Sequence, residues 1–148
     1  MMKVAILNGP NLNLLGSREP GIYGNFTLDD IEKKLRKIAV DSGRCIELVA
    51  YQSNIEGELI NFIHKSKQNG IDYIIFNPGA YTHTSIALHD AISGVDAKVI
   101  EVHISNIHKR ESFREFSYIS KVSIGQIVGF GINSYILAMQ YIAGLAHE

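Results

Sequence analysis

The stretch "DYIIFN", residues 72–77, carries the clearest structural signal in the chain. Its apolar residues run on without alternating with polar ones, which is typical of a strand buried on both faces of a parallel sheet. Comparable runs occupy residues 3–8 ("KVAILN"), 45–51 ("CIELVAY"), 98–104 ("KVIEVHI") and 125–131 ("GQIVGFG"). We therefore expect five strands, and the segments between them decide how the strands connect.

Helical segments alternate with these strands. Thr27 is placed to cap a helix that ends at Gly43, with Asp30 completing a capping box. Further helices are expected over residues 56–68, 85–93 and about 134–146. The alternation predicts an α/β protein, a single domain over residues 1–148. Right-handed crossovers make the most economical arrangement a flavodoxin-like, doubly wound, five-stranded parallel sheet of order 2-1-3-4-5 with helices on both faces.

The composition excludes several classes of function. With 46% hydrophobic residues, 20% charged residues and a formal net charge of −1, the chain resembles a soluble globular protein without a general attraction to nucleic acid or anionic membranes. The apolar run near the amino terminus is too short for a signal or membrane segment, so we expect a cytoplasmic location. Cys45 is the only cysteine, and its apolar surroundings predict a buried, inert thiol.

Polar residues follow three of the expected strands. In a sheet of this order, ligands bind beyond the carboxyl ends of the strands, beside the point where the order reverses. The loops after the first, third and fourth strands carry Asn8, Asn11, Asn13, Asn77, Thr82, His83, Thr84, Glu101, His103, Ser105 and Asn106. We expect these loops to converge on one crevice.

The fourth strand suggests acid–base chemistry. Its period of two places Glu101, His103 and Ser105 on one face. An isolated Glu–His pair usually satisfies internal hydrogen bonds, but a strand end that faces two polar loops favours a functional role. A carboxylate beside an imidazole suits a histidine that must deliver a proton. Asp90 lies two helical turns from His83 and is expected to face the same crevice. His89 is expected to be a solvated residue on the helix.

Three common classes of site lack their motifs. The sequence has no G-x-G-x-x-G after the first strand, no Walker A motif and no G-x-S-x-G elbow. A metal held by His83, Asp90, Glu101 and His103 is conceivable. Amides and hydroxyls dominate the converging set, however, and transition metals do not prefer these ligands, so we expect no metal.

The remaining polar groups favour a small, hydroxyl-rich, anionic substrate. Arg114 offers a planar fork for a hydroxyl pair or a carboxylate. Backbone N–H groups near Ile104 and Ser105 are placed to hold a carboxylate at the strand end. Arg110 is expected to be an ordinary surface residue.

The loop "GSREPGIYGN", residues 16–25, carries Arg18 and Tyr23 between glycines. A neighbouring guanidinium stabilises a phenolate and lowers the pKa of the tyrosine, which makes a base available. Glycines on both sides allow the loop to close over a substrate as a mobile lid. The alternative is a mobile loop whose exposed tyrosine packs against a neighbour, and the loop alone does not decide between the two.

Four motifs in order, "NGPNLNLLGSREPGIYG", "QSNIEGELI", "NPGAYTHTSIALHDA" and "EVHISNIHKRESFREFSYIS", together resemble type II 3-dehydroquinate dehydratase. The resemblance covers essentially the whole chain and ends in "GFGINSYILA". It implies a flavodoxin-like lyase of the shikimate pathway that converts 3-dehydroquinate into 3-dehydroshikimate. It also implies the absence of metal and cofactor, and a homododecamer built from trimers.

The resemblance also implies a role for each matching residue. Tyr23, activated by Arg18, would remove the proton alpha to the ketone, and Asn11 with a bound water would stabilise the enolate. His103 would protonate the departing hydroxyl. Substrate hydroxyls would be held by Asn77, His83, Asp90 and Arg114, and the carboxylate by Ile104 and Ser105; Glu101 would act through its neighbours. His89 departs from the family pattern, which more often has arginine there.

Two alternatives stay open at this point. One is a non-catalytic, flavodoxin-like binding module, and the other is a different lyase or isomerase that forms an enolate from another cyclic hydroxy acid. The sequence also leaves open whether the activity serves biosynthesis or the breakdown of quinate.

Overall fold

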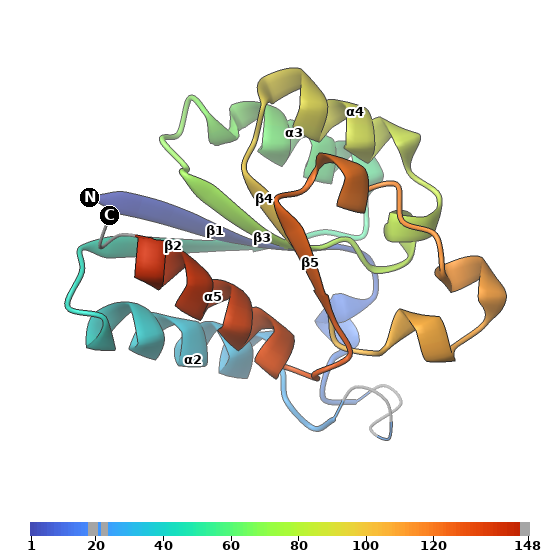
Figure 1. The fold of residues 1–148 in the computed structure, drawn as a ribbon, viewed down its shortest axis with the longest axis horizontal. Helices are drawn as coiled ribbons and strands as arrows, with labels where there is room; N and C mark the ends of the chain where they lie inside the picture. Colours follow the sequence, from blue (N-terminus) through green and yellow to red (C-terminus); the bar gives the residue numbers. More distant parts are fainter. Residues whose placement is uncertain (18–20, 22–23, 146–148) are drawn as a thin grey trace.

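The computed structural model describes residues 1–17, 21 and 24–145. A five-stranded parallel sheet lies at its centre, in the order β2-β1-β3-β4-β5 (Figure 1). The strands are β1 (Met2–Asn8), β2 (Ile46–Gln52), β3 (Tyr73–Asn77), β4 (Val99–His103) and β5 (Gly125–Val128). The predicted fold class and strand order are confirmed.

Two pairs of helices cover the sheet. Helices α3 (Glu56–Ser66) and α4 (Ile86–Val95) lie on one face, and α2 (Leu28–Asp41) and α5 (Asn133–Leu145) lie on the other (Figure 1). The capping box predicted for α2 is present, because the Thr27 hydroxyl accepts from the Asp30 N–H and the Asp30 carboxylate accepts from the Thr27 N–H. Each of these two bonds gives a partner to a backbone N–H group at the start of the helix.

Alternate strand residues fill two separate cores. Val4 and Ile6 of β1 pack beneath α2 and α5, whereas Ala5 and Leu7 pack beneath α3 and α4. A strand covered in this way is apolar at every position, which explains the uninterrupted runs in the sequence. In β4 the same alternation sends Ile100 and Val102 into the first core, and Ile104, directly after the strand, joins them there.

The last two strands are shorter than the sequence predicts. β4 ends at His103 and β5 ends at Val128, rather than at residues 104 and 131. Gly129 and Gly131 both adopt positive φ angles, of 91° and 62°. This conformation turns the chain away from the sheet, so the apolar run continues beyond the strand.

The loops that follow β1 and β3 interlock. The Gly9 N–H donates to the Asn77 carbonyl at 2.8 Å, and a Cβ atom on Gly9 would lie 2.4 Å from the Pro78 carbonyl oxygen. Gly79, with φ of 61°, approaches the Pro10 carbonyl in the same way. Any side chain at position 9 would therefore displace the loop that follows β3.

The prediction of a buried Cys45 is wrong, since its side chain is exposed. Cys45 precedes β2, which is an edge strand in which Leu48 is the one buried residue. An apolar run therefore does not guarantee burial at the edge of a sheet. Within the described ranges, no helix is long and apolar enough to cross a membrane.

Candidate active site

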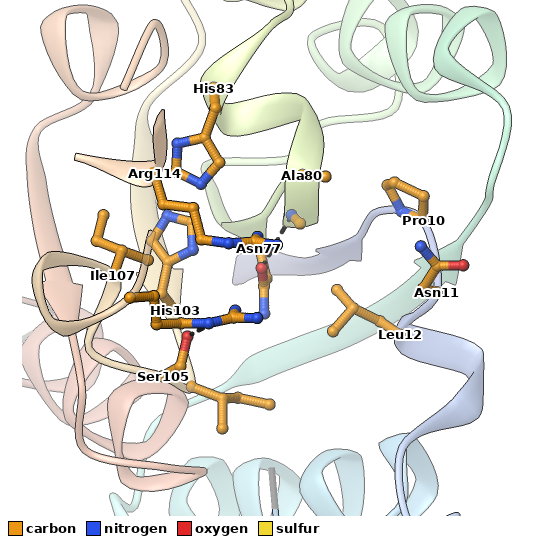
Figure 2. Close-up of a pocket in the computed structure, with 13 residues that line it drawn as sticks. Pro10, Asn11, Leu12, Asn77, Ala80, His83, His103, Ser105, Ile107 and Arg114 are labelled. Atoms are coloured by element: carbon orange, nitrogen blue, oxygen red, sulfur yellow. Dashed lines mark hydrogen bonds between the residues drawn. The ribbon is translucent and has the colours of Figure 1, made fainter. Parts of the chain in front are cut away.

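A pocket of about 220 Å³ opens at the carboxyl ends of β1, β3 and β4 (Figure 2). His83 and His103 lie together on one side of it, and Asn11 and Leu12 lie on the other. The predicted site residues that line the pocket are Asn11, Asn77, His83, His103, Ile104, Ser105 and Arg114. Residues from widely separated parts of the sequence thus meet at one end of the sheet.

Asp90 does not line the pocket of its own chain. Its side chain is 71% exposed, and its carboxylate contacts the His89 ring nitrogen Nδ1 at 3.0 Å. The expected alignment with His83 assumed one continuous helix. His83 instead belongs to the 3₁₀ turn Gly79–His83, and α4 begins only at Ile86, so a seven-residue spacing does not place the two side chains on one face.

Arg18 and Tyr23 lie outside the described residues, as does part of the expected lid at residues 16–25. Their predicted roles therefore rest on the sequence motif.

Arg110 lines the pocket, although the sequence suggested an ordinary surface residue. Its side chain is only 18% exposed, and Nη1 lies 3.4 Å from the Ser105 hydroxyl. The segment after β4 contains the 3₁₀ turns Ile107–Lys109 and Ser112–Arg114, which bring Arg110 and Arg114 back toward the strand end. One feature of the sequence could have predicted this position: Arg110 lies in the same loop as Ser105 and Arg114.

The His103 ring forms a hydrogen bond with a buried carboxyl group. Its Nε2 atom lies 2.5 Å from Glu101 Oε2 and 3.5 Å from the Thr82 hydroxyl. Glu101 is fully buried, and it also accepts hydrogen bonds from the Ser117 hydroxyl at 2.9 Å and from Gln126 Nε2 at 2.8 Å. These donors satisfy the buried carboxyl oxygens. With Nε2 held by Glu101, Nδ1 is the ring nitrogen of His103 that is left for a ligand.

His83 presents a hydrogen-bond acceptor. Its Nδ1 atom lies 2.8 Å from the Phe116 carbonyl oxygen, and because a carbonyl only accepts, Nδ1 carries the proton. Burial lowers the pKa of His83, and the nearby His103 and Arg114 lower this pKa further against the opposing effect of the Phe116 bond. The ring is therefore neutral at pH 7, and its Nε2 lone pair is available to a ligand hydroxyl.

The charge of the pocket favours an anion. Arg110 and Arg114 both line it, and no carboxylate does so among the residues that the structure describes. Glu111 lies outside the pocket wall and accepts from Arg114 Nε at 2.6 Å, which lowers the pKa of the Glu111 carboxyl and fixes the guanidinium. A ligand that carries a carboxylate and several hydroxyls would match these donors and the His83 acceptor.

The four residues considered for a metal do not form a ligand set within this chain. Glu101 is already hydrogen-bonded on both of its oxygens, and Asp90 points elsewhere. Across the described part of the chain, no group of three or more His, Cys, Asp or Glu side chains is arranged to hold a metal ion.

Comparison with known proteins gives a consistent result. Residues 2–143 match the family model described as dehydroquinase class II. The 3-dehydroquinate dehydratase of Cellvibrio japonicus is 54% identical over 140 residues, which cover 95% of this chain and 93% of the relative. The 3-dehydroquinate dehydratase of Polynucleobacter necessarius is 53% identical, with 93% and 91% coverage.

Solved structures agree with the sequence comparison. The crystal structure of the type II dehydroquinase from Butyrivibrio crossotus superimposes with a TM-score of 0.90 at 46% identity, covering 95% of this chain and 97% of the other. The type II dehydroquinase from Propionibacterium acnes gives the same TM-score at 38% identity, with 97% of each chain covered. On these matches, and on a fold that agrees with the predicted one, the chain belongs to the class II dehydroquinase family.

Proposed function

We propose that this chain dehydrates 3-dehydroquinate to 3-dehydroshikimate in the shikimate pathway, with Tyr23 as the base and His103 as the acid. The observation that carries the proposal is His103 at the end of β4, held through Nε2 by the buried Glu101 in a pocket that contains two guanidinium groups. Such a ring is oriented for proton transfer in a site that favours an anionic ligand.

The reaction needs a base and an acid that act in sequence. The Tyr23 phenolate, stabilised by Arg18, takes the proton from the carbon alpha to the ketone, and an enolate forms. Asn11, on the pocket wall, stabilises the enolate oxygen through a bound water. His103 then donates a proton to the hydroxyl on the neighbouring carbon, which leaves as water. The support for Tyr23 and Arg18 is their place in the family motif.

Binding falls to the groups around this pair. Asn77, Arg114 and the neutral His83 hold substrate hydroxyls, with His83 Nε2 as an acceptor. Backbone N–H groups of Ile104 and Ser105 bind the carboxylate at the strand end. Glu101 keeps the His103 ring in place without contacting the substrate. Asp90 is left out of this arrangement, because it lies outside the pocket of its own chain.

Four further parts of the proposal rest on similarity to the family. They are a homododecamer of four trimers, a cytoplasmic location, a lid at about residues 16–25 that closes over the substrate, and catalysis without a metal or cofactor. Neither nucleic acid nor a membrane is a partner in this proposal. Light scattering of the purified protein and turnover after treatment with a strong chelator would test the first and the last of these.

An ultraviolet assay with purified protein and 3-dehydroquinate tests the function, because the conjugated product absorbs and the substrate hardly does. Wild-type protein should give steady growth of absorbance. The Tyr23→Phe variant keeps the ring but has no proton acceptor, so it should lose about 10²–10⁴-fold of the rate. No absorbance growth with wild type would refute the function and favour a binding module. An active Tyr23→Phe variant would refute the mechanism alone.

A further inference from the structure

Three polar side chains form a buried network beside the pocket. Asn8 and Asn77 lie opposite each other at the ends of β1 and β3, and Tyr135 reaches them from α5. Tyr135 is 0% exposed, Asn77 is 3% exposed and Asn8 is 4% exposed. Asn77 is the member of the network that also lines the pocket (Figure 2). The network therefore connects the core beneath α5 with the surface that a ligand would touch.

The hydrogen bonds of this network can run in only one direction. The backbone N–H of Gly79 must donate, so the atom of Asn77 that it meets at 3.1 Å is the oxygen Oδ1. The amide nitrogen of Asn77 then faces the Tyr135 hydroxyl at 2.9 Å and donates to it. The hydroxyl in turn gives its single proton to Asn8 Oδ1 at 2.6 Å.

Tyr135 remains protonated in this arrangement. Complete burial raises the pKa of its hydroxyl well above the ordinary value of 10.0, and the bond from Asn77 only partly opposes this effect. The hydroxyl is thus a lasting donor to Asn8 and a lasting acceptor from Asn77, and it has no role as a base.

The amide of Asn77 keeps an N–H donor for a ligand. Its oxygen accepts from Gly79, and Tyr135 is the partner of its nitrogen among the described residues, so one of the two N–H bonds of that nitrogen remains. We propose that Tyr135 is a positioning residue, which fixes the Asn77 amide so that the pocket presents an N–H donor to an oxygen of the substrate. The inference rests on the proposed function, because it takes Asn77 as a substrate-binding residue.

A purely structural role would have a different consequence. If Tyr135 only fills the core, phenylalanine would occupy nearly the same volume, and the loss would appear in stability alone. If Tyr135 orients Asn77, loss of the hydroxyl leaves a buried N–H without an acceptor and allows the amide to rotate. A contact to a non-reacting substrate oxygen is made before and during the reaction, so its loss raises KM and leaves kcat nearly unchanged.

The test is the Tyr135→Phe variant in the ultraviolet assay. We expect KM for 3-dehydroquinate to rise by about tenfold, the equivalent of one hydrogen bond, with kcat within about threefold of wild type. Ser66→Ala is the matched control, because it also removes a buried hydroxyl, which donates to the Ile63 carbonyl on α3 far from the pocket. The control should keep the wild-type KM. A wild-type KM in Tyr135→Phe would overturn the proposal.

A double-mutant cycle separates positioning from a general loss of structure. In an Asn77→Ala background, adding Tyr135→Phe should change KM by less than about twofold, because the oriented group is already gone. An equal rise in both backgrounds would overturn the proposal. If Tyr135→Phe does not fold, Asn8→Ala replaces it in the same cycle, since it removes the acceptor that orients the Tyr135 proton.

A readout that does not depend on turnover keeps this inference apart from the proposed function. Hydrogen exchange of the Asn77 side-chain amide, followed by NMR, should be slow in wild type, fast in Tyr135→Phe and slow in Ser66→Ala. Failure of the wild-type protein to dehydrate 3-dehydroquinate would contradict the function and leave this measurement valid. Equal exchange in all three proteins would contradict the positioning role.

Discussion

A pocket lies at each end of the sheet, yet of these two pockets only one has the properties of an active site. The pocket at the amino ends is the larger, about 490 Å³ against about 220 Å³. Charged residues in its wall include Arg44, Asp72 and Lys98, of which Asp72 and Lys98 are exposed. The buried polar side chains at the carboxyl end include Asn8, Asn77, Glu101 and His103. Buried polar groups that take part in hydrogen bonds, rather than volume, therefore mark the functional end.

The largest contrast between the two ends should appear in turnover. His103→Ala removes the proposed acid, so kcat should fall by about 10²–10⁴-fold while the substrate still binds. Lys98→Ala changes a charge at the amino end and should leave kcat within about twofold, because surface side chains contribute little. The ultraviolet assay measures both. Near-normal turnover in His103→Ala would remove this residue from its proposed role.

The next contrast concerns binding. Arg114→Ala should raise KM by about 10- to 100-fold, since a hydrogen bond to a charged group contributes more than a neutral one. Arg114→Lys should restore part of the loss, because an ammonium carries the charge without the planar fork. Arg44→Ala, at the other end, is the control and should leave KM unchanged. Equal effects of Arg44→Ala and Arg114→Ala on KM would contradict the conclusion that the carboxyl end is the one that binds the substrate.

The interlocked loops should make the carboxyl end more sensitive to a single methyl group. A Cβ at position 9 would meet the Pro78 carbonyl oxygen at 2.4 Å, so Gly9→Ala should reduce the free energy of unfolding by about 1–3 kcal/mol. Gly94, in α4, has nothing within 4 Å of an added Cβ, and Gly94→Ala should stabilise by about 0.4–1 kcal/mol. Urea unfolding measures both changes. A stable Gly9→Ala would show that the loops separate easily.

The smallest effect concerns pH. Burial holds the pKa of His83 below its ordinary value of 6.5, so the unfolded chain binds more protons at this residue than the folded protein does. Stability should therefore be complete above pH 6.5 and decline as the pH falls through 6.5 toward the lowered pKa. The slope of the unfolding free energy with pH reports the protons taken up on unfolding. His83→Gln should lower this number by less than one. Identical urea midpoints as a function of pH in the two proteins would contradict this cause.

The fold was predictable because its signals are local and repeated. Apolar runs such as 72–77 mark strands covered on both faces, and right-handed crossovers leave few arrangements for five of them. The strand ends were less predictable. Gly129 and Gly131 turn the chain through positive φ angles, and nothing in the run "GQIVGFG" shows where the hydrogen bonding stops. Likewise, the exposure of Cys45 depends on β2 being an edge strand, which the predicted strand order implied but the apolar neighbours of Cys45 did not show.

The site was predictable where strands position it and less so where loops do. Asn77 and His103 end β3 and β4, so a topological argument locates both. Arg110 lies between 3₁₀ turns that have no repeating period, and Asp90 was misplaced because α4 begins after His83. The partners of the buried groups, such as Tyr135 beneath Asn77, depend on side-chain packing across distant segments. Sequence spacing alone carries no information about such contacts.

The exposed Cys45 has a practical consequence. It is the only thiol in the chain, and it lies at the amino end of the sheet, where its carbonyl accepts from the Met2 N–H. A maleimide dye would therefore attach at one defined point per chain, away from the pocket. If the Cys45 thiol were joined to a maleimide on a coated surface instead, the pocket would lie at the opposite end of the sheet and face the solution. Cys45 thus offers a handle for single-molecule observation of substrate capture that needs no change to the sequence.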